Sequence, residues 1–221
     1  MLTRLIGVAL LAGLLAGLVT AALQTRLLEP LIVEAEKFEA APMHHDGMVM
    51  PAPATSASMI RIATTAVATA GVGVGYALML LAAMLATETG ITWRSGLLWG
   101  ACGFAACGLA PAFGLPPSLP GAAEADLTAR QVWWIATAFG TAGGLWLLLR
   151  GRRAWQTALG LILVAAPHII GAPGGVAPTS TVPAELAAAF TARSLGLQAV
   201  LWLTMAAAAG WLWSRQEGTQ P

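Results

Sequence analysis

One short segment gathers most of the side chains that could bind a ligand. Residues 43–50 read Met-His-His-Asp-Gly-Met-Val-Met. The imidazoles of His44 and His45 and the carboxylate of Asp46 suit divalent cobalt, nickel or zinc, whereas thioethers favour monovalent copper. The thioethers here belong to Met43, Met48 and Met50. The segment therefore predicts contact with a transition metal without selecting one, and an adventitious polar loop is the alternative interpretation.

The third histidine, His168, stands inside an apolar run directly after Pro167. Proline removes a backbone donor and disturbs a helix, and an ionisable group at membrane depth is a candidate functional residue. The alternative is a histidine that bonds to a freed carbonyl or to interfacial water. We treat His168 as a further candidate metal ligand, with Glu185, Arg193 and Gln198 expected at a similar level.

Long uncharged runs must position these residues. The chain is 57% hydrophobic and only 10% charged, whereas soluble domains carry roughly 25% charged residues. A helix of about 20 residues crosses the hydrocarbon of a bilayer, and the runs lack the alternation of a membrane barrel. We predict one all-α integral membrane domain over residues 1–221, a bundle of about six transmembrane helices with five as the alternative. The predicted spans are residues 5–23, 62–87, 95–115, 131–149, 154–172 and 194–214.

A compact basic cluster predicts the orientation. Arg150, Arg152 and Arg153 crowd the link between the fourth and fifth runs, and the positive-inside rule places such a link in the cytoplasm. Both termini then lie in the cytoplasm, and residues 24–59 form a long outer loop that begins with an acidic helical stretch. Most acidic residues also face outward, which attracts cations unless these acids only solvate the loops. They are Glu29, Glu34, Glu36, Glu39, Asp46, Glu124, Asp126 and Glu185.

Small residues and a short repeat predict how the helices pack. Glycines four residues apart let helices approach closely in lipid, and Cys102 and Cys107 are interpreted as packing residues because no paired geometry is visible. The tripeptide Thr-Ala-Arg occurs at 128–130 and again at 191–193, which suggests three related, outward-looped hairpins. The glycine pairs are Gly13 and Gly17, Gly71 and Gly75, and Gly96 and Gly100.

Two classes of function are excluded by composition and pattern. The net charge of +1 and the lack of a basic stripe with interleaved aromatics exclude a nucleic-acid partner. No nucleophile and base, paired carboxylates or closed metal triad stand at recognisable spacing, so we expect no enzyme. We also expect no permanently bound cofactor, only a transported divalent metal ion. The bilayer is the expected partner.

The chain resembles the CbtA family, proposed cobalt transporter subunits of bacterial membranes. The segments that match are Arg4-Leu5-Ile6, Glu34-Ala35-Glu36, His44-His45, Leu119-Pro120-Gly121 and Arg130-Gln131-Val132-Trp133-Trp134. The resemblance implies cobalt uptake linked to cobalamin synthesis, in the bacterial inner membrane. It also implies a small partner similar to CbtB, with one span and a histidine-bearing tail, and five spans rather than six. The alternatives are a non-transporting assembly subunit or a copper or nickel permease.

Overall fold

The protein is built from helices throughout its described part. The computed structural model describes residues 1–39, 54–119, 126–174 and 182–217, and every regular element in these ranges is helical. The elements in chain order are α1 (Leu2–Leu27), α2 (Glu29–Glu39), α3 (Ala54–Ala86), α4 (Trp93–Phe104), the π-helix η1 (Ala105–Leu109), α5 (Ala110–Ala112), α6 (Leu127–Arg150), α7 (Ala154–Ile170) and α8 (Ala184–Glu217). The predicted all-α membrane bundle is confirmed.

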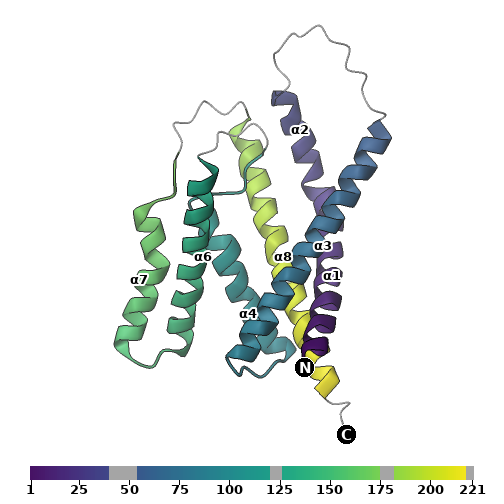
Figure 1. Ribbon diagram of the computed structural model, residues 1–221. Coiled ribbons are helices and arrows are strands. Elements are labelled where there is room, and N and C mark those ends of the chain that lie inside the picture. The colour runs from purple at the N-terminus through teal and green to yellow at the C-terminus, as the bar shows by residue number, and fades with distance from the viewer. Residues whose placement is uncertain (40–53, 120–125, 175–181, 218–221) are drawn as a thin grey trace.

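The helices run up and down between two ends of the bundle (Figure 1). The start of α1, the end of α8 and the α6–α7 link lie at one end, which we call the basal end. The end of α2 and the starts of α3, α6 and α8 lie at the other, the apical end. The predicted arrangement, with both termini and the arginine-rich link on one side, therefore agrees with the observed directions of the helices.

The described residues contain five helical segments that are long and apolar enough to cross a membrane. Helix α7 has the residues of the fifth predicted run but is only 17 residues long, or about 26 Å at 1.5 Å per residue. It nevertheless runs back from the basal to the apical end, which allows α6 and α8 to run in the same direction (Figure 1). Of the two counts that the sequence left open, six and five, the described residues favour five full-length spans, with α7 as a shorter apolar helix beside them.

Several helices extend beyond the predicted spans at the apical end. Helix α8 begins at Ala184, ten residues before the predicted start at 194, and α3 begins at Ala54 rather than at 62. Alanine-rich sequence favours helix irrespective of hydropathy, so charges such as Glu185 and Arg193 do not end α8. The acidic stretch expected at the start of the outer loop is confirmed as α2.

The core lies where α1, α3, α4 and α8 meet. Helix α1 packs against both α3 and α8, and α4 packs against α8. Large side chains such as Leu81, Met84 and Met205 are fully buried in this core, which also contains Trp202, stacked on Tyr76 with ring centroids 4.4 Å apart. Four helices around one apolar cluster thus form the buried core of the bundle.

Glycines set the closest helix contacts. A Cβ at Gly13 or Gly17 would collide with the α3 backbone at Val74 or Ala70, so side-chain-free surfaces are needed there. Gly96 and Gly100 similarly lie against Ala206 and Trp202 of α8. The prediction for Gly71 and Gly75 is wrong, because no described residue lies within 4 Å of a Cβ placed at either position. The α3 surface that meets α1 instead includes Gly73, against the Gly13 carbonyl.

Replacing Gly13 by leucine should weaken the bundle. The new side chain must force α1 away from α3, and overpacking of this kind costs about 1–3 kcal/mol. The same leucine at Gly71 points into open space and should leave stability unchanged. Thermal unfolding of both variants in detergent checks this. Equal melting temperatures for the two would show that the α1–α3 contact is not as close as described.

The pairing of the last helices differs from the hairpin prediction. Helix α7 packs against α6 and makes no contact with α8 in the described ranges. The repeated tripeptide also occupies unequal positions, since Thr128 follows the start of α6 by one residue while Thr191 lies seven residues into α8. The third hairpin is therefore not a packed unit, and the tripeptide does not mark equivalent helix starts.

Arginines and tryptophans pair along the basal end. An interfacial indole and a basic side chain both prefer the headgroup region, and a guanidinium over an indole ring gains a cation–π contact. The distances from guanidinium carbon to ring centroid are 4.1 Å for Arg4 and Trp213, 4.4 Å for Arg215 and Trp211, 5.1 Å for Arg150 and Trp146, and 5.3 Å for Arg94 and Trp93. The basal end thus carries a belt suited to a membrane surface.

Candidate functional site

The predicted metal-binding loop falls on residues that the structure does not describe. His44, His45, Asp46, Met43, Met48 and Met50 all lie outside the described residues. The helices on either side, α2 and α3, are joined by an ion pair in which Arg61 Nη1 lies 3.0 Å from Glu36 Oε1. Both partners are exposed, so the pair contributes little stability. The pair shows that α2 and α3, which flank the loop, lie side by side at Glu36 and Arg61.

His168 lies near the apical end of α7, in an aromatic setting. Its ring stands edge-on to Phe113 and Trp133, with centroids 6.1 and 6.0 Å away. Pro167 does not break α7, since the helix continues to Ile170. The Pro167 carbonyl accepts a hydrogen bond from Trp133 Nε1 at 3.2 Å. In the described ranges no group of three or more His, Cys, Asp or Glu side chains could hold a metal ion. His168 as a metal ligand stays a prediction.

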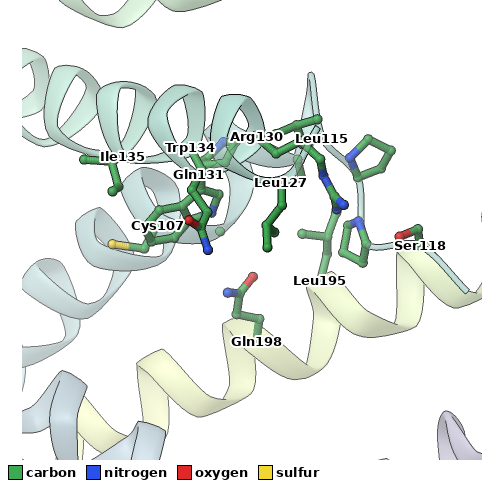
Figure 2. A pocket seen from close by; sticks show the side chains of 15 residues that line it. Cys107, Leu115, Ser118, Leu127, Arg130, Gln131, Trp134, Ile135, Leu195 and Gln198 are labelled. Carbon is green, nitrogen blue, oxygen red and sulfur yellow. The ribbon is translucent and has the colours of Figure 1, made fainter. Parts of the chain in front are cut away.

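A cavity of about 490 Å³ with a few polar side chains in its lining opens between α5, α6 and α8. Figure 2 shows the side chains of Gln131 and Gln198 pointing toward each other across it, from α6 and α8. We call it the amide cavity. Its apical wall is the connection after α5, with Leu115, Pro116 and Ser118, and α6 begins beside it at Leu127.

The amide cavity has a mixed electrostatic character. Amide groups are neutral and can accept or donate hydrogen bonds, so they can contact the water shell of an ion. Arg130, one residue before Gln131, brings a permanent positive charge to the same lining. The cavity can therefore hold water or a hydrated ion, with the Gln131 and Gln198 amides as its neutral polar groups.

An irregular helix forms the wall opposite α8. Between α4 and α5 the chain adopts the π-helix η1, in which the Ala110 N–H bonds to the Ala105 carbonyl. Pro111 follows and has no N–H to continue an α-helical ladder. The wide turn brings Gly108 against Gln198, whose Cδ would lie 2.9 Å from a Cβ at this position. Single π-turns within α-helices occur frequently at functional sites.

A second cavity, of about 360 Å³, continues toward the basal end. It shares Cys107 with the amide cavity, and in Figure 2 the Cys107 sulfur points away from Gln198. Cys102 and Met79 also line it, so we call it the sulfur cavity. At its basal limit Arg150 donates to Thr89 Oγ1 at 3.0 Å.

The two cavities together extend over most of the height of the bundle. The amide cavity begins at the apical residues Ser118 and Leu127, and the sulfur cavity reaches Leu149 and Arg150. Cys107 stands where they meet, although the sequence suggested only a packing role for it. Gln198, which the sequence placed only at a level similar to His168, lines the amide cavity. Arg130 and Gln131, which also line it, stood at the start of an apolar run and in a segment that resembles the CbtA family.

Comparison with protein families decides what this bundle is related to. Residues 2–214 match the model of a family described as "Probable cobalt transporter subunit (CbtA)". The chain belongs to the CbtA family. The match covers nearly the whole chain, including both cavities, and a CbtA protein is a membrane transport subunit. The word subunit implies that a CbtA protein acts with a partner protein. No curated protein and no solved structure matches the chain.

Proposed function

We propose that this CbtA chain is the membrane subunit of an uptake system for a divalent transition-metal ion, with cobalt destined for cobalamin synthesis as its main cargo. The observation that carries the proposal is the pair of cavities that meet at Cys107 and extend from Ser118 to Arg150. A purely structural bundle has no need of such a series of cavities. The basal end, with its arginines and both termini, faces the cytoplasm of a bacterial cell.

Capture occurs in residues 43–50, which we call the apical segment because the helices that flank it in sequence, α2 and α3, end and begin at the apical end (Figure 1). His44, His45 and Asp46 exchange the waters of the incoming ion, with the methionines of the same segment as weaker ligands. Of the acids of α2, Glu34 and Glu36 are ion-paired with Lys37 and Arg61, so the incoming cation meets little net negative charge there. The ion then enters the helical bundle. The apical segment thus exchanges the ligands of the ion, and the two cavities let the ion pass through the bundle.

The membrane potential supplies the driving force. Moving two positive charges inward across about 100 mV releases on the order of 4–5 kcal/mol, which suffices for uptake without nucleotide hydrolysis. The chain has no Walker-type glycine loop for binding a nucleotide phosphate. The partner subunit is a small single-span protein, similar to CbtB, whose histidines pass metal to the apical segment.

The sulfur cavity favours one alternative cargo. Cys102, Cys107 and Met79 offer soft ligands, which prefer monovalent copper to divalent cobalt. A copper permease would use these three residues together with the methionines of the apical segment. A non-transporting assembly subunit is the other alternative, favoured by the largely apolar lining of the sulfur cavity, which includes Trp99, Trp146 and Trp202.

Uptake into proteoliposomes distinguishes these functions. We expect vesicles that contain the chain and its single-span partner to accumulate Co²⁺ when the interior is negative, with less accumulation of Ni²⁺ and Cu⁺. The control is the same vesicle with the potential collapsed by an ionophore. Preferential accumulation of Cu⁺ would assign the copper function. Absence of any metal uptake, with the chain folded and both proteins present, would leave the assembly role.

A further inference from the structure

A chain of hydrogen bonds crosses the basal limit of the sulfur cavity. Arg150 Nη2 donates to Thr89 Oγ1 at 3.0 Å, and the hydroxyls of Thr89 and Thr87 lie 3.0 Å apart in a second hydrogen bond. Thr87 Oγ1 donates in turn to the Ala83 carbonyl at 2.8 Å. Arg150 on α6 and Ala83 on α3 both line the cavity. The chain of hydrogen bonds therefore connects two walls of the sulfur cavity at its basal edge.

This bridge spans a place where the backbones do not meet. The end of α6 and the turn between α3 and α4 both lie at the basal end (Figure 1). Within the described ranges α6 packs mainly against α7, η1 and α5, and its backbone makes no close contact with α3. Arg150 is the last residue of α6, and Thr89 lies in the turn. The side chain of Arg150 thus closes a gap that backbone packing leaves open.

The turn that carries Thr89 is fixed from within. The Thr89 N–H bonds to the Met84 carbonyl at 2.9 Å, and Ser95 Oγ donates to the Gly90 carbonyl at 2.7 Å. Arg150, by contrast, is exposed at a helix end, and a long basic side chain in such a place can extend toward the headgroup region. Any opening of the bridge therefore moves Arg150 rather than the turn.

Arg150 also brings the only charge to the lining of the sulfur cavity. Its guanidinium carbon lies 5.1 Å from the ring centroid of Trp146, and no carboxylate is ion-paired with it in the part of the chain that the structure describes. Arg152 and Arg153 follow in the same link but do not line the cavity. Like charges repel, and an apolar wall screens them less than bulk water. A cation that reaches the basal limit is therefore opposed by Arg150 in particular.

We propose that Arg150 is a gate at the basal mouth of the sulfur cavity. Bonded to Thr89, it closes the mouth to water and ions, and released from Thr89 it opens the mouth. An ion that arrives from Cys107 repels the guanidinium, which moves to the headgroup region, where basic side chains are favourable. The hydrogen bond to Thr89 forms again after the ion has left. This inference rests on the proposed function, for which it supplies the exit step.

Labelling of Cys102 tests the gate apart from transport. Cys107→Ser leaves Cys102 as the one thiol of the chain, and this thiol lines the sulfur cavity. The chain is reconstituted in nanodiscs and treated with two membrane-impermeant methanethiosulfonates, one cationic and one anionic. The thiolate displaces methanesulfinate and forms a mixed disulfide, whose added mass is measured over time. The rate with each reagent reports how readily charged solutes reach the cavity from water.

Two variants open the gate in different ways. Thr89→Val removes the hydrogen bond and keeps the arginine, so both reagents should label about threefold faster, the effect of one hydrogen bond of modest net strength. Arg150→Ala removes the bond and the charge together. The cationic reagent should then label at least about tenfold faster, with a smaller gain for the anionic reagent.

Arg152→Ala is the matched control for the change in charge. It removes a positive charge from the same link without altering the cavity lining, and it should label at the parent rate with both reagents. Thr89→Ser keeps the hydroxyl and should also behave like the parent. Melting temperatures equal to that of the parent show that a variant is folded, and the rate after unfolding in detergent shows that Cys102 is reactive.

The outcomes separate the gate from the proposed function. Parent rates in both Arg150→Ala and Thr89→Val would overturn the gate, and so would equal acceleration in Arg152→Ala. The gate is also overturned if no folded variant is labelled while the unfolded chain reacts. Acceleration confined to Arg150→Ala and Thr89→Val supports the gate even where vesicles with the partner take up no metal, a result that would refute only the transport function. Metal uptake with unchanged labelling rates would keep the function and remove the gate.

Discussion

Replacing Gly108 by leucine is expected to reduce Co²⁺ uptake at least about tenfold. A side chain at this position must displace the Gln198 amide, whose Cδ would lie 2.9 Å from the new Cβ. It must also displace Phe104, whose Cδ2 would lie 3.1 Å from that Cβ. Overpacking costs about 1–3 kcal/mol, and each 1.4 kcal/mol added to a barrier slows a step roughly tenfold. Initial uptake rates into vesicles with the partner present measure the effect.

A blocked passage must be separated from a damaged fold. Gly71→Leu places the same side chain where no described residue lies within 4 Å of the new Cβ. This variant should transport Co²⁺ normally. Combining Gly108→Leu with Gln198→Gly returns the space and should restore part of the uptake. If Gly108→Leu melts at the parent temperature and transports at the parent rate, the ion does not pass between η1 and α8.

Removing both apical imidazoles should have a comparably large effect at low external metal. In the His44→Ala, His45→Ala variant two ligands are lost, and the loss even of groups that support a metal ligand typically weakens binding about 10–100-fold. We therefore expect the Co²⁺ concentration for half-maximal uptake to rise at least about tenfold. The maximal rate should change little, because capture precedes passage through the bundle.

His168→Ala is the matched comparison for this prediction. Its ring contacts Phe113 and Trp133, and it lines neither the amide cavity nor the sulfur cavity. We expect its half-saturation concentration to match the parent. A rise confined to His168→Ala, with the double variant unaffected, would transfer the capture role from the apical segment to α7.

The membrane-spanning helices were predictable because the bilayer imposes a simple requirement on sequence. Any segment that crosses hydrocarbon must satisfy its backbone internally and expose few charges, so an uncharged run directly predicts a helix such as α1 or α6. The apical extension of α8 was missed because polar residues such as Glu185 and Arg193 do not prevent helix formation outside the hydrocarbon. Hydropathy locates the lipid-facing length of a helix, not its ends.

Contacts between helices were predicted only in part. The glycine spacing correctly predicted a close contact at Gly13 and Gly17 and wrongly predicted one at Gly71 and Gly75, because spacing fixes a face but not the neighbour that meets it. The pairing of α7 with α6 likewise depends on packing partners. The short Arg150–Ala154 connection favoured that pairing, whereas the tripeptide repeat pointed elsewhere.

The candidate site was the least predictable part. Gln198 stood out as a polar group within an apolar run, which is a signal that sequence can give. Cys107 and Gly108 gave none, since their positions in the cavity walls depend on the π-turn. Thr20 and Ser194, which line a further cavity that reaches Gln198, were equally inconspicuous, because a hydroxyl in a membrane helix usually bonds to its own backbone. Among the residues that the structure describes, neither of these two hydroxyls has a hydrogen-bond partner.

The π-helix η1 also fixes the angular register of α5, which continues the same helix. A π-turn amounts to one residue inserted into an α-helix, and one residue corresponds to a rotation of about 100°. Without the insertion, Pro111 and the connection after it would point away from α8, and the apical wall of the amide cavity would be lost. The cavity thus depends on the one extra residue in this helix. A family member with one residue fewer between Gly103 and Pro111 would need a different route through its bundle.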